Sequence, residues 1–154
     1  IADAGVALGR GQDDGAGRML LIDLQALSAA SATLALTRNI VGRERPFQRA
    51  CDGDDPDPGC GAPDSRRSFV SGHTALAFVN AGLVCTQHAE LDLWGGGAAD
   101  DVACGLAVTT AVTVGVLRIV ADKHYATDVL GGALVGVLAG FVLPRVLHYG
   151  FGRD

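Results

Sequence analysis

Apolar residues recur along this chain in four long runs, and the first two predict helices. Residues 18–38 carry apolar side chains at helical intervals and contain neither Gly nor Pro. Residues 72–88 follow Ser71, whose hydroxyl can accept a hydrogen bond from the first backbone N–H groups of a helix. We therefore expect a long helix in the first segment and a capped helix in the second.

The third and fourth runs are also expected to be helical. The third covers 102–118, with Asp100 or Asp101 as its candidate N-cap. Its Thr and Val residues would also suit a strand, but a run of this length favours a helix. The fourth covers 125–148, and Pro144 is expected to kink it or end it.

Four helices predict an all-α bundle of a single domain, which 154 residues are enough to form. Hydrophobic residues make up 49% of the chain, aromatic residues only 5%, and there are 22 Gly, so the helices must pack closely on small and aliphatic side chains. The sequence begins with Ile1 rather than Met. We expect that a signal peptide, a propeptide or another upstream segment is missing from it.

The apolar runs are about 14 to 18 residues long, which is short for a membrane span and long for a soluble bundle. If all four cross a membrane, residues 38–70 and 118–124 lie on one side with eight of the 12 Lys and Arg residues. Cations usually gather on the cytoplasmic side. An integral membrane protein that collects arginines for its function fits this pattern, and so does a soluble protein of the cell envelope.

The cysteines indicate an oxidising compartment, and we expect a site that faces away from the cytoplasm. Cys51 and Cys60 bracket a loop rich in Asp, Pro and Gly, where a disulfide would restrict the unfolded chain; two free thiols are the alternative. The sequence leaves open whether Cys85 and Cys104 pair. The Cys and His spacings do not fit zinc, and Pro56 falls where an EF-hand loop needs a ligand, so no bound metal is expected.

Three polar segments are expected to meet at one end of the bundle. The first helix ends in RNIVGRERPF, the second begins at SFVSGHTA, and the connection between the third and fourth reads RIVADKHYATD. Successive helices of an up-and-down bundle run antiparallel, so these segments fall at the same end. The formal net charge of −5 argues against nucleic acid as a partner, and any anion must be held locally.

These segments contain the residue types of a phosphate site. Arg38, Arg45 and Arg118 would bring three permanent positive charges, each with a fork of donors that matches phosphate oxygens. The start of the second helix adds backbone N–H groups and the positive end of the helix dipole. Gly72 lets the main chain approach a ligand closely, and Ser71 adds a hydroxyl.

Two histidines would supply a reaction on that phosphate. His124 and Asp128 are four residues apart, so we expect them on one helix face, with the carboxylate accepting the Nδ1 proton. Nε2 is then a nucleophile for phosphorus, and His73 would protonate the departing oxygen. The expected intermediate is a phosphohistidine that water cleaves, without a cofactor.

Each cluster alone also has an ordinary explanation. A His and an Asp four residues apart are often a surface pair, and Ser-Gly-His is often only a capped helix start. Asp23, inside an apolar helix, would be a surface residue, a buried hydrogen-bonded residue or an interhelical partner. His88 and His148 are expected at the other end and are interpreted as non-catalytic. The remaining charges near the clusters are interpreted as solvated or supporting: Arg43, Glu44, Arg66, Arg67, Asp122 and Lys123.

Together the three segments resemble the signature of the phosphatidic acid phosphatase type 2 and vanadium haloperoxidase superfamily. That signature is Lys, six residues, Arg-Pro; then Pro-Ser-Gly-His; then Ser-Arg, five residues, His, three residues, Asp. The spacings agree, and three positions differ: Arg38 replaces the Lys, Val70 replaces the Pro and Leu117 replaces the Ser. None of these differences removes a reacting group.

The resemblance implies a metal-independent phosphatase with a helical bundle and its active site at one end. It implies His124 as nucleophile, Asp128 as its orienting partner and His73 as general acid. It implies five phosphate-binding residues: Arg38, Arg45, Ser71, Gly72 and Arg118. The substrate would be a phosphorylated small molecule or a lipid phosphate or diphosphate, and the sequence does not predict the oligomeric state. Two alternatives stay open, namely vanadate-dependent halide oxidation and a non-catalytic envelope protein that binds phosphate headgroups.

Overall fold

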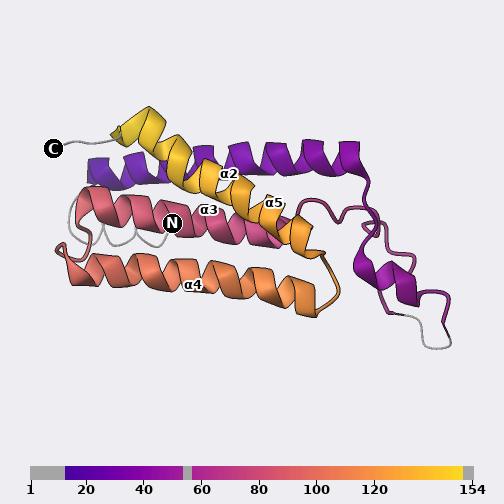
Figure 1. The fold of residues 1–154 in the computed structure, drawn as a ribbon. Helices are drawn as coiled ribbons and strands as arrows, with labels where there is room; N and C mark the ends of the chain where they lie inside the picture. The colour runs from indigo at the N-terminus through magenta and orange to yellow at the C-terminus, as the bar shows by residue number, and fades with distance from the viewer. Residues whose placement is uncertain (1–12, 54–56, 151–154) are drawn as a thin grey trace.

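The computed structural model describes residues 13–53 and 57–150, and these form a bundle of helices that run up and down (Figure 1). No strand occurs in the described residues, so the expected all-α bundle is confirmed. The four α-helices are α2 (Asp13–Val41), α3 (Gly72–Leu91), α4 (Ala98–Val120) and α5 (Ala126–Val137). Three shorter turns complete the fold: the 3-10 turn η1 (Pro46–Ala50) and the π-helical turns η2 (Leu138–Val142) and η3 (Arg145–Tyr149).

The core lies where α3 packs against the other helices. α3 contacts α2, α4, α5 and η2, which makes it the central helix. Its Val79 and Leu83 pack against a stripe of small and aliphatic residues on α2, including Ile22 and Ala26. Residues three and four apart on a helix share one face, so α2 turns this stripe toward α3 and leaves its other faces exposed.

Two helix ends differ from the sequence prediction. α4 begins at Ala98 with Gly97 as its N-cap, so neither Asp100 nor Asp101 caps it. Asp100 is buried instead and accepts hydrogen bonds from the backbone N–H groups of Trp94 and Gly96. A carboxylate can satisfy more than one orphan N–H group, and here those groups belong to the loop before the helix rather than to its first turn.

Pro144 does not end the last helix. Its backbone is helical, with φ −60° and ψ −39°, and a π-helical turn lies on each side of it. Proline lacks the N–H that a regular turn would use, and the wider turns accommodate that loss. Helical structure therefore continues to Tyr149.

Two disulfides tie the structure together. The predicted bridge between Cys51 and Cys60 closes the connection that follows η1, and Cys85 of α3 pairs with Cys104 of α4. Three segments among the described residues are long and apolar enough to cross a membrane: Gly15–Ala50, Ala98–Val120 and Ala126–Tyr149.

Candidate active site

The three polar segments lie together at one end of the bundle (Figure 1). Arg38 lies in the last turn of α2 and Arg118 in the last turn of α4. His73 is the second residue of α3, and His124 lies in the turn between α4 and α5. Local structure thus explains the convergence, since each of these candidate residues is at or next to a helix end.

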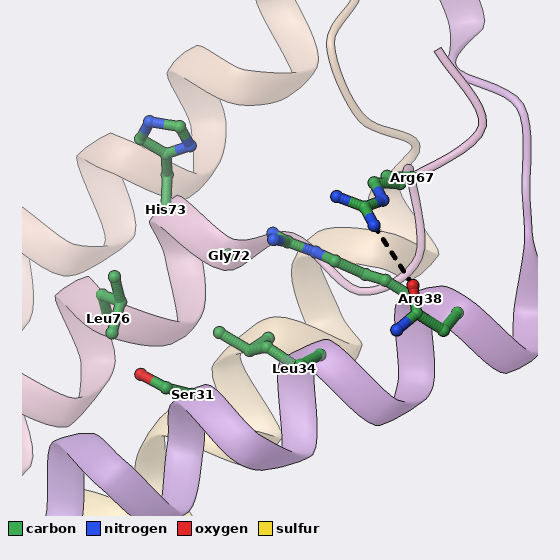
Figure 2. A pocket seen from close by; sticks show the side chains of 9 residues that line it. Ser31, Leu34, Arg38, Arg67, Gly72, His73 and Leu76 are labelled. Atoms are coloured by element: carbon green, nitrogen blue, oxygen red, sulfur yellow. Dashed lines mark hydrogen bonds between the residues drawn. The ribbon is translucent and has the colours of Figure 1, made fainter. Parts of the chain in front are cut away.

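A cavity of about 380 Å³ opens between α2 and α3 at this end (Figure 2). Arg38, Gly72 and His73 line it, and Arg67 reaches it from the segment before α3. The rest of the lining comes from α2 and α3: Ser31, Leu34, Ala35, Asn39 and Leu76. The cavity therefore joins a cationic end to a partly apolar wall.

Gly72 allows the guanidinium group of Arg38 to lie directly against the start of α3. A Cβ atom on residue 72 would overlap Nη2 of Arg38. Nε of Arg38 donates to the carbonyl oxygen of Val70 at 3.3 Å, which leaves the four N–H groups on its Nη atoms for a ligand. An anion bound there would also meet the positive end of the helix dipole.

Arg45 fixes the segment that carries His124. Arg45 is buried. Its Nε donates to the main-chain carbonyl oxygen of Asp64 at 3.1 Å, and its Nη2 donates to the carboxylate of Asp64 at 2.8 Å. Its Nη1 donates to the carbonyl oxygen of Lys123 at 3.2 Å. Because Lys123 directly precedes His124, this hydrogen bond restrains the turn while keeping the positive charge close to the imidazole.

Arg118 has a buried Nε–H with no hydrogen-bond partner among the described residues. A buried donor left unsatisfied costs about 1–3 kcal/mol, so an oxygen ligand at this position would be stabilising. The backbone carbonyl of Arg118 also accepts from the N–H groups of Lys123 and His124, both at 3.2 Å. Arg45 and Arg118 lie within electrostatic range of both His73 and His124, so the two imidazoles share one cationic region.

His124 is held by the Ser68 carbonyl group rather than by Asp128. Its Nδ1 lies 2.8 Å from the carbonyl oxygen of Ser68 and 3.8 Å from Oδ2 of Asp128. The expected Nδ1–H to carboxylate hydrogen bond is therefore not formed. The reason is that His124 precedes α5, whose N-cap is Tyr125, so His124 and Asp128 do not share a helix face.

Asp128 is linked to His124 through Ser68. The carboxylate is fully buried, and its Oδ2 accepts hydrogen bonds from the Ser68 hydroxyl and from the Tyr125 N–H. Its Oδ1 accepts from Nη1 of Arg43 at 2.8 Å. Ser68 thus contacts His124 with its main chain and Asp128 with its side chain.

Sequence reasoning missed Ser68 and interpreted Arg43 as solvated or supporting charge. Arg43 also donates to the Thr127 hydroxyl at 2.7 Å, and its guanidinium lies 4.1 Å from the ring centre of Tyr125. Neither Ser68 nor Arg43 occupies a position of the matched motifs. No spacing signal in the sequence marks them, since both act across contacts between distant segments.

The environment of His124 keeps its imidazole neutral. Burial, followed by the positive charge of Arg45, lowers the pKa of His124 from 6.5 to about 4, and the Ser68 carbonyl and Asp128 oppose this only in part. At neutral pH the ring carries one proton. With that proton donated from Nδ1 to Ser68, the lone pair is on Nε2.

Ser71 caps α3 as predicted. Its hydroxyl is buried, lies 2.9 Å from the hydroxyl of Thr74 and accepts from the Thr74 N–H at 3.5 Å. Its own N–H donates to the backbone carbonyl of Asp128 at 2.9 Å, which joins the starts of α3 and α5. A role for the Ser71 hydroxyl in phosphate binding stays a prediction.

The arginines of this end divide into two groups by their partners. Arg43, Arg45 and Arg66 each form an ion pair with a carboxylate. Arg38, Arg49, Arg67 and Arg118 form none with any carboxylate in the part of the chain that the structure describes. This end therefore has an excess of positive charge that suits an anion. No three His, Cys, Asp or Glu side chains within the described ranges are grouped as a metal site requires.

An all-α bundle that gathers two histidines and several arginines without carboxylate partners in the described ranges at one end belongs to the class of helical proteins with a cationic site suited to phosphate or a similar oxyanion. Residues 20–151 match the PAP2 superfamily, and the chain belongs to that family. The chain is also similar to a protein named lipid A 1-phosphatase from Porphyromonas gingivalis, with 30% identity over 131 residues. The match covers 85% of this chain and 24% of that relative, so the chain spans about a quarter of the relative's length. No solved structure matches the chain significantly.

Proposed function

We propose that the protein is a phosphatase that transfers a phosphoryl group to His124 and then to water. The observation that carries the proposal is a neutral, oriented imidazole near Arg118, which has no carboxylate partner among the described residues. Membership of the PAP2 superfamily and similarity to a protein named lipid A 1-phosphatase support phosphatase chemistry.

The phosphate would be bound by permanent charges and by the start of α3. Arg38 and Arg118 offer N–H groups that no described carboxylate occupies, whereas Arg45 is paired with Asp64 and acts on the anion from a greater distance through its charge. Gly72 lets Arg38 and the helix start approach the same anion. Charge-assisted hydrogen bonds of this kind strengthen as charge develops on the equatorial oxygens during transfer.

In the first step, the Nε2 lone pair of His124 attacks phosphorus and a nitrogen–phosphorus bond forms. The bond from phosphorus to the leaving oxygen breaks, and His73 donates a proton to that oxygen. The negative charge of the substrate offsets the nearby arginines, which helps His73 to carry that proton. The Nδ1–H of His124 stays hydrogen-bonded to the carbonyl oxygen of Ser68, and this hydrogen bond stabilises the phosphorylated ring.

In the second step, water attacks the phosphohistidine. His73, now neutral, accepts a proton from the water, the nitrogen–phosphorus bond breaks and inorganic phosphate leaves. Asp128 and Arg43 take no proton in this scheme. They hold Ser68 and Tyr125 in place, and through them the imidazole.

We propose a lipid phosphate as the substrate and a membrane as the location. The cationic end of the cavity continues into a wall that includes Leu34 and Leu76, which suits a headgroup followed by an apolar chain. Three segments are long and apolar enough to span a membrane. The disulfide between Cys51 and Cys60 lies near the active-site end, and it supports a site that faces away from the cytoplasm.

The test compares His124→Ala with His148→Ala in detergent-purified protein. His148 lies far from the site, and its Nε2 is 2.6 Å from Oε1 of Gln25. Its substitution therefore controls for the loss of a histidine elsewhere in the protein. With phosphatidic acid and p-nitrophenyl phosphate, His124→Ala should lose at least about 10³-fold in kcat, while His148→Ala keeps the wild-type rate.

A second measurement tests the intermediate itself. Wild-type protein quenched in alkali during turnover of a phosphorus-labelled substrate should carry label that is stable to base and labile to acid. Full activity in His124→Ala, or the same label in that variant, would refute the assignment of the nucleophile.

A further inference from the structure

We propose that Lys123 is a positioning residue for His124 and that it couples the reaction to the disulfide between Cys51 and Cys60. That disulfide joins η1 to residues 57–60, and η1, Cys51 and residues 57–60 are together called the strap. The inference rests on the proposed function and adds a residue that occupies none of the matched motif positions. Neither Lys123 nor the disulfide lines the cavity between α2 and α3, so both would act through His124.

The turn that carries His124 is tied to the start of the strap by its main chain. The N–H of Phe47 donates to the carbonyl oxygen of Asp122 at 3.3 Å, and Nη1 of Arg45 donates to that of Lys123 at 3.2 Å. Asp122 has a φ of 51°, a left-handed conformation that is uncommon outside glycine. The shape of this turn therefore depends on the contacts that hold it.

The side chain of Lys123 contacts the same strap. Its Nζ lies 4.3 Å from the ring centre of Phe47 and 3.5 Å from Oδ1 of Asp57. A cation over an aromatic face is attracted to it, and the carboxylate adds to that attraction. Phe47 is buried, so its ring is a fixed support. Lys123 thus contacts the strap with its side chain, while its main chain continues directly into His124.

The disulfide keeps residues 57–60 against Phe47. Gly59, next to Cys60, packs so closely on the ring that a Cβ atom there would lie 3.0 Å from it. The carboxylate of Asp57 accepts a hydrogen bond from the Gly59 N–H at 2.7 Å, which orients it. Without the disulfide, residues 57–60 would lose their covalent link to η1, and the groups around Lys123 would be free to move apart.

A small shift of the turn matters because Nε2 of His124 must lie in line with the phosphorus atom. A misplacement of about 1 Å can cost about 10²-fold in rate. Binding of the phosphate should change much less, since Arg38 and Gly72 belong to α2 and α3 rather than to the turn. Loss of the strap contact should therefore lower kcat and leave KM nearly unchanged.

The experiment measures kcat and KM for p-nitrophenyl phosphate in detergent-purified variants. Lys123→Met keeps a long side chain without its charge, and it should lower kcat about 5- to 20-fold with KM within about twofold. Lys123→Arg should restore most of the rate, because a guanidinium also stacks on an aromatic face. Arg66→Met is the matched control. It removes a positive charge that pairs with Glu44 rather than with the strap, and it should match the wild type.

Asp57→Asn separates positioning from a simple effect of charge. The amide oxygen can still accept from the Gly59 N–H, but it brings no negative charge to Lys123. A purely electrostatic role predicts a faster or tighter reaction with an anionic substrate, because one negative charge is lost. Positioning predicts the opposite sign, namely a kcat about 2- to 5-fold lower with KM unchanged.

A cycle of variants tests the coupling to the disulfide. Cys51→Ser with Cys60→Ser should lower kcat about as much as Lys123→Met, and all three changes together should cost little more than either alone. Cys85→Ser with Cys104→Ser is the control, because that disulfide joins α3 to α4 and does not belong to the strap. Its kcat per folded molecule, with folding measured by circular dichroism, should be unchanged.

The Nδ1 proton of His124 gives a readout without turnover. In the wild type, its hydrogen bond to the Ser68 carbonyl should make it a slowly exchanging proton in NMR spectra. Lys123→Met should speed this exchange at least about fivefold, and Arg66→Met should not.

Four results would overturn the positioning role: wild-type kcat in Lys123→Met, a higher rate in Asp57→Asn, additive losses in the cycle, or unchanged exchange of the His124 proton. If the wild type hydrolyses no phosphate ester, the proposed function fails instead. The exchange of the His124 proton alone then decides whether Lys123 positions the imidazole.

Discussion

At the scale of single residues, the main feature is a histidine whose environment favours attack over protonation. His124 is 1% exposed, its Nδ1 is 2.8 Å from a main-chain oxygen, and Arg45 places a positive charge nearby. A main-chain acceptor fixes the tautomer without adding a full negative charge to the ring. Asp128 is 3.8 Å from the same nitrogen and does not accept a hydrogen bond from it. Its negative charge raises the pKa of His124 by less than burial and Arg45 lower it.

This environment predicts the acid limb of the pH profile. The pKa of His124 lies near 4, below its usual 6.5, so the proposed nucleophile stays neutral until the pH falls to about 4. After correction for the substrate's own ionisation, the acid limb of kcat/KM should fall tenfold per unit only below about 4. Burial and the charge of Arg118 lower the pKa of His73, the proposed general acid, so kcat/KM should also fall as the pH rises toward neutral and His73 loses its proton. Steady-state rates on p-nitrophenyl phosphate measure this. A midpoint of the acid limb near 6.5 would show an ordinary, solvated imidazole and contradict the buried environment.

At the scale of helices, glycine positions set how closely α5 and η2 approach α3. Gly132, Gly136 and Gly140 recur every fourth residue and lie against α3 and its N-cap. A Cβ atom on Gly140 would overlap the main-chain oxygen of Val79. Small residues at this spacing let two helix backbones pack directly, which matters most where no hydrophobic effect drives the helices together. The approach also holds the start of α5, with Asp128, against the start of α3.

Gly140→Ala should therefore destabilise the bundle by about 2 kcal/mol, because Val79 main-chain atoms cannot move aside as a flexible side chain would. Gly105→Ala on α4 is the matched control, since nothing lies within 4 Å of its Cβ position. That change should leave the free energy of unfolding unchanged or raise it slightly, as alanine favours helix. Unfolding in one detergent measures both variants. Equal stability of the two would mean that α3 and η2 are not in direct contact.

At the scale of the whole molecule, the helices expose many large apolar side chains, while the hydrogen-bonded pair of Asp23 and Gln87 is buried between them. Leu24, Leu106 and Leu134 are each more than 60% exposed, on α2, α4 and α5 respectively. Asp23 of α2 is buried and accepts a hydrogen bond from Gln87 of α3 at 2.7 Å, so it is not a surface residue but a buried, hydrogen-bonded residue that joins two helices. Large apolar surfaces are rare on soluble monomers, whereas a lipid bilayer covers them without cost.

We therefore expect the protein to stay in the membrane fraction after washing with alkaline carbonate and to leave it only with detergent. The three candidate spans provide the physical reason, because their exposed apolar side chains would otherwise face water. Fractionation followed by immunoblotting checks this. Release of the protein by carbonate or by osmotic shock would indicate a soluble envelope protein, which the sequence left as an alternative.

Much of the fold and the identity of the candidate site residues followed from local patterns. Apolar periodicity predicted the four helices, and Ser71 was correctly predicted as the cap of α3. The boundaries were less predictable, because Gly97 and Pro144 act through turn geometry that composition does not reveal. The partners of His124 and Asp128 were predicted incorrectly, because the spacing of four residues implied a shared helix that begins only at Ala126.

The sequence alone determined which residue types meet at which end, since helix periodicity and antiparallel connections depend on neighbouring residues and short turns. It also showed the resemblance to the PAP2 superfamily, which the match over residues 20–151 confirms. Only the tertiary structure decided that Ser68 holds His124, that Arg43 neutralises Asp128 and that Arg67 reaches the cavity. These contacts join segments far apart in the chain, and their distances depend on how closely the helices pack, which no local pattern records.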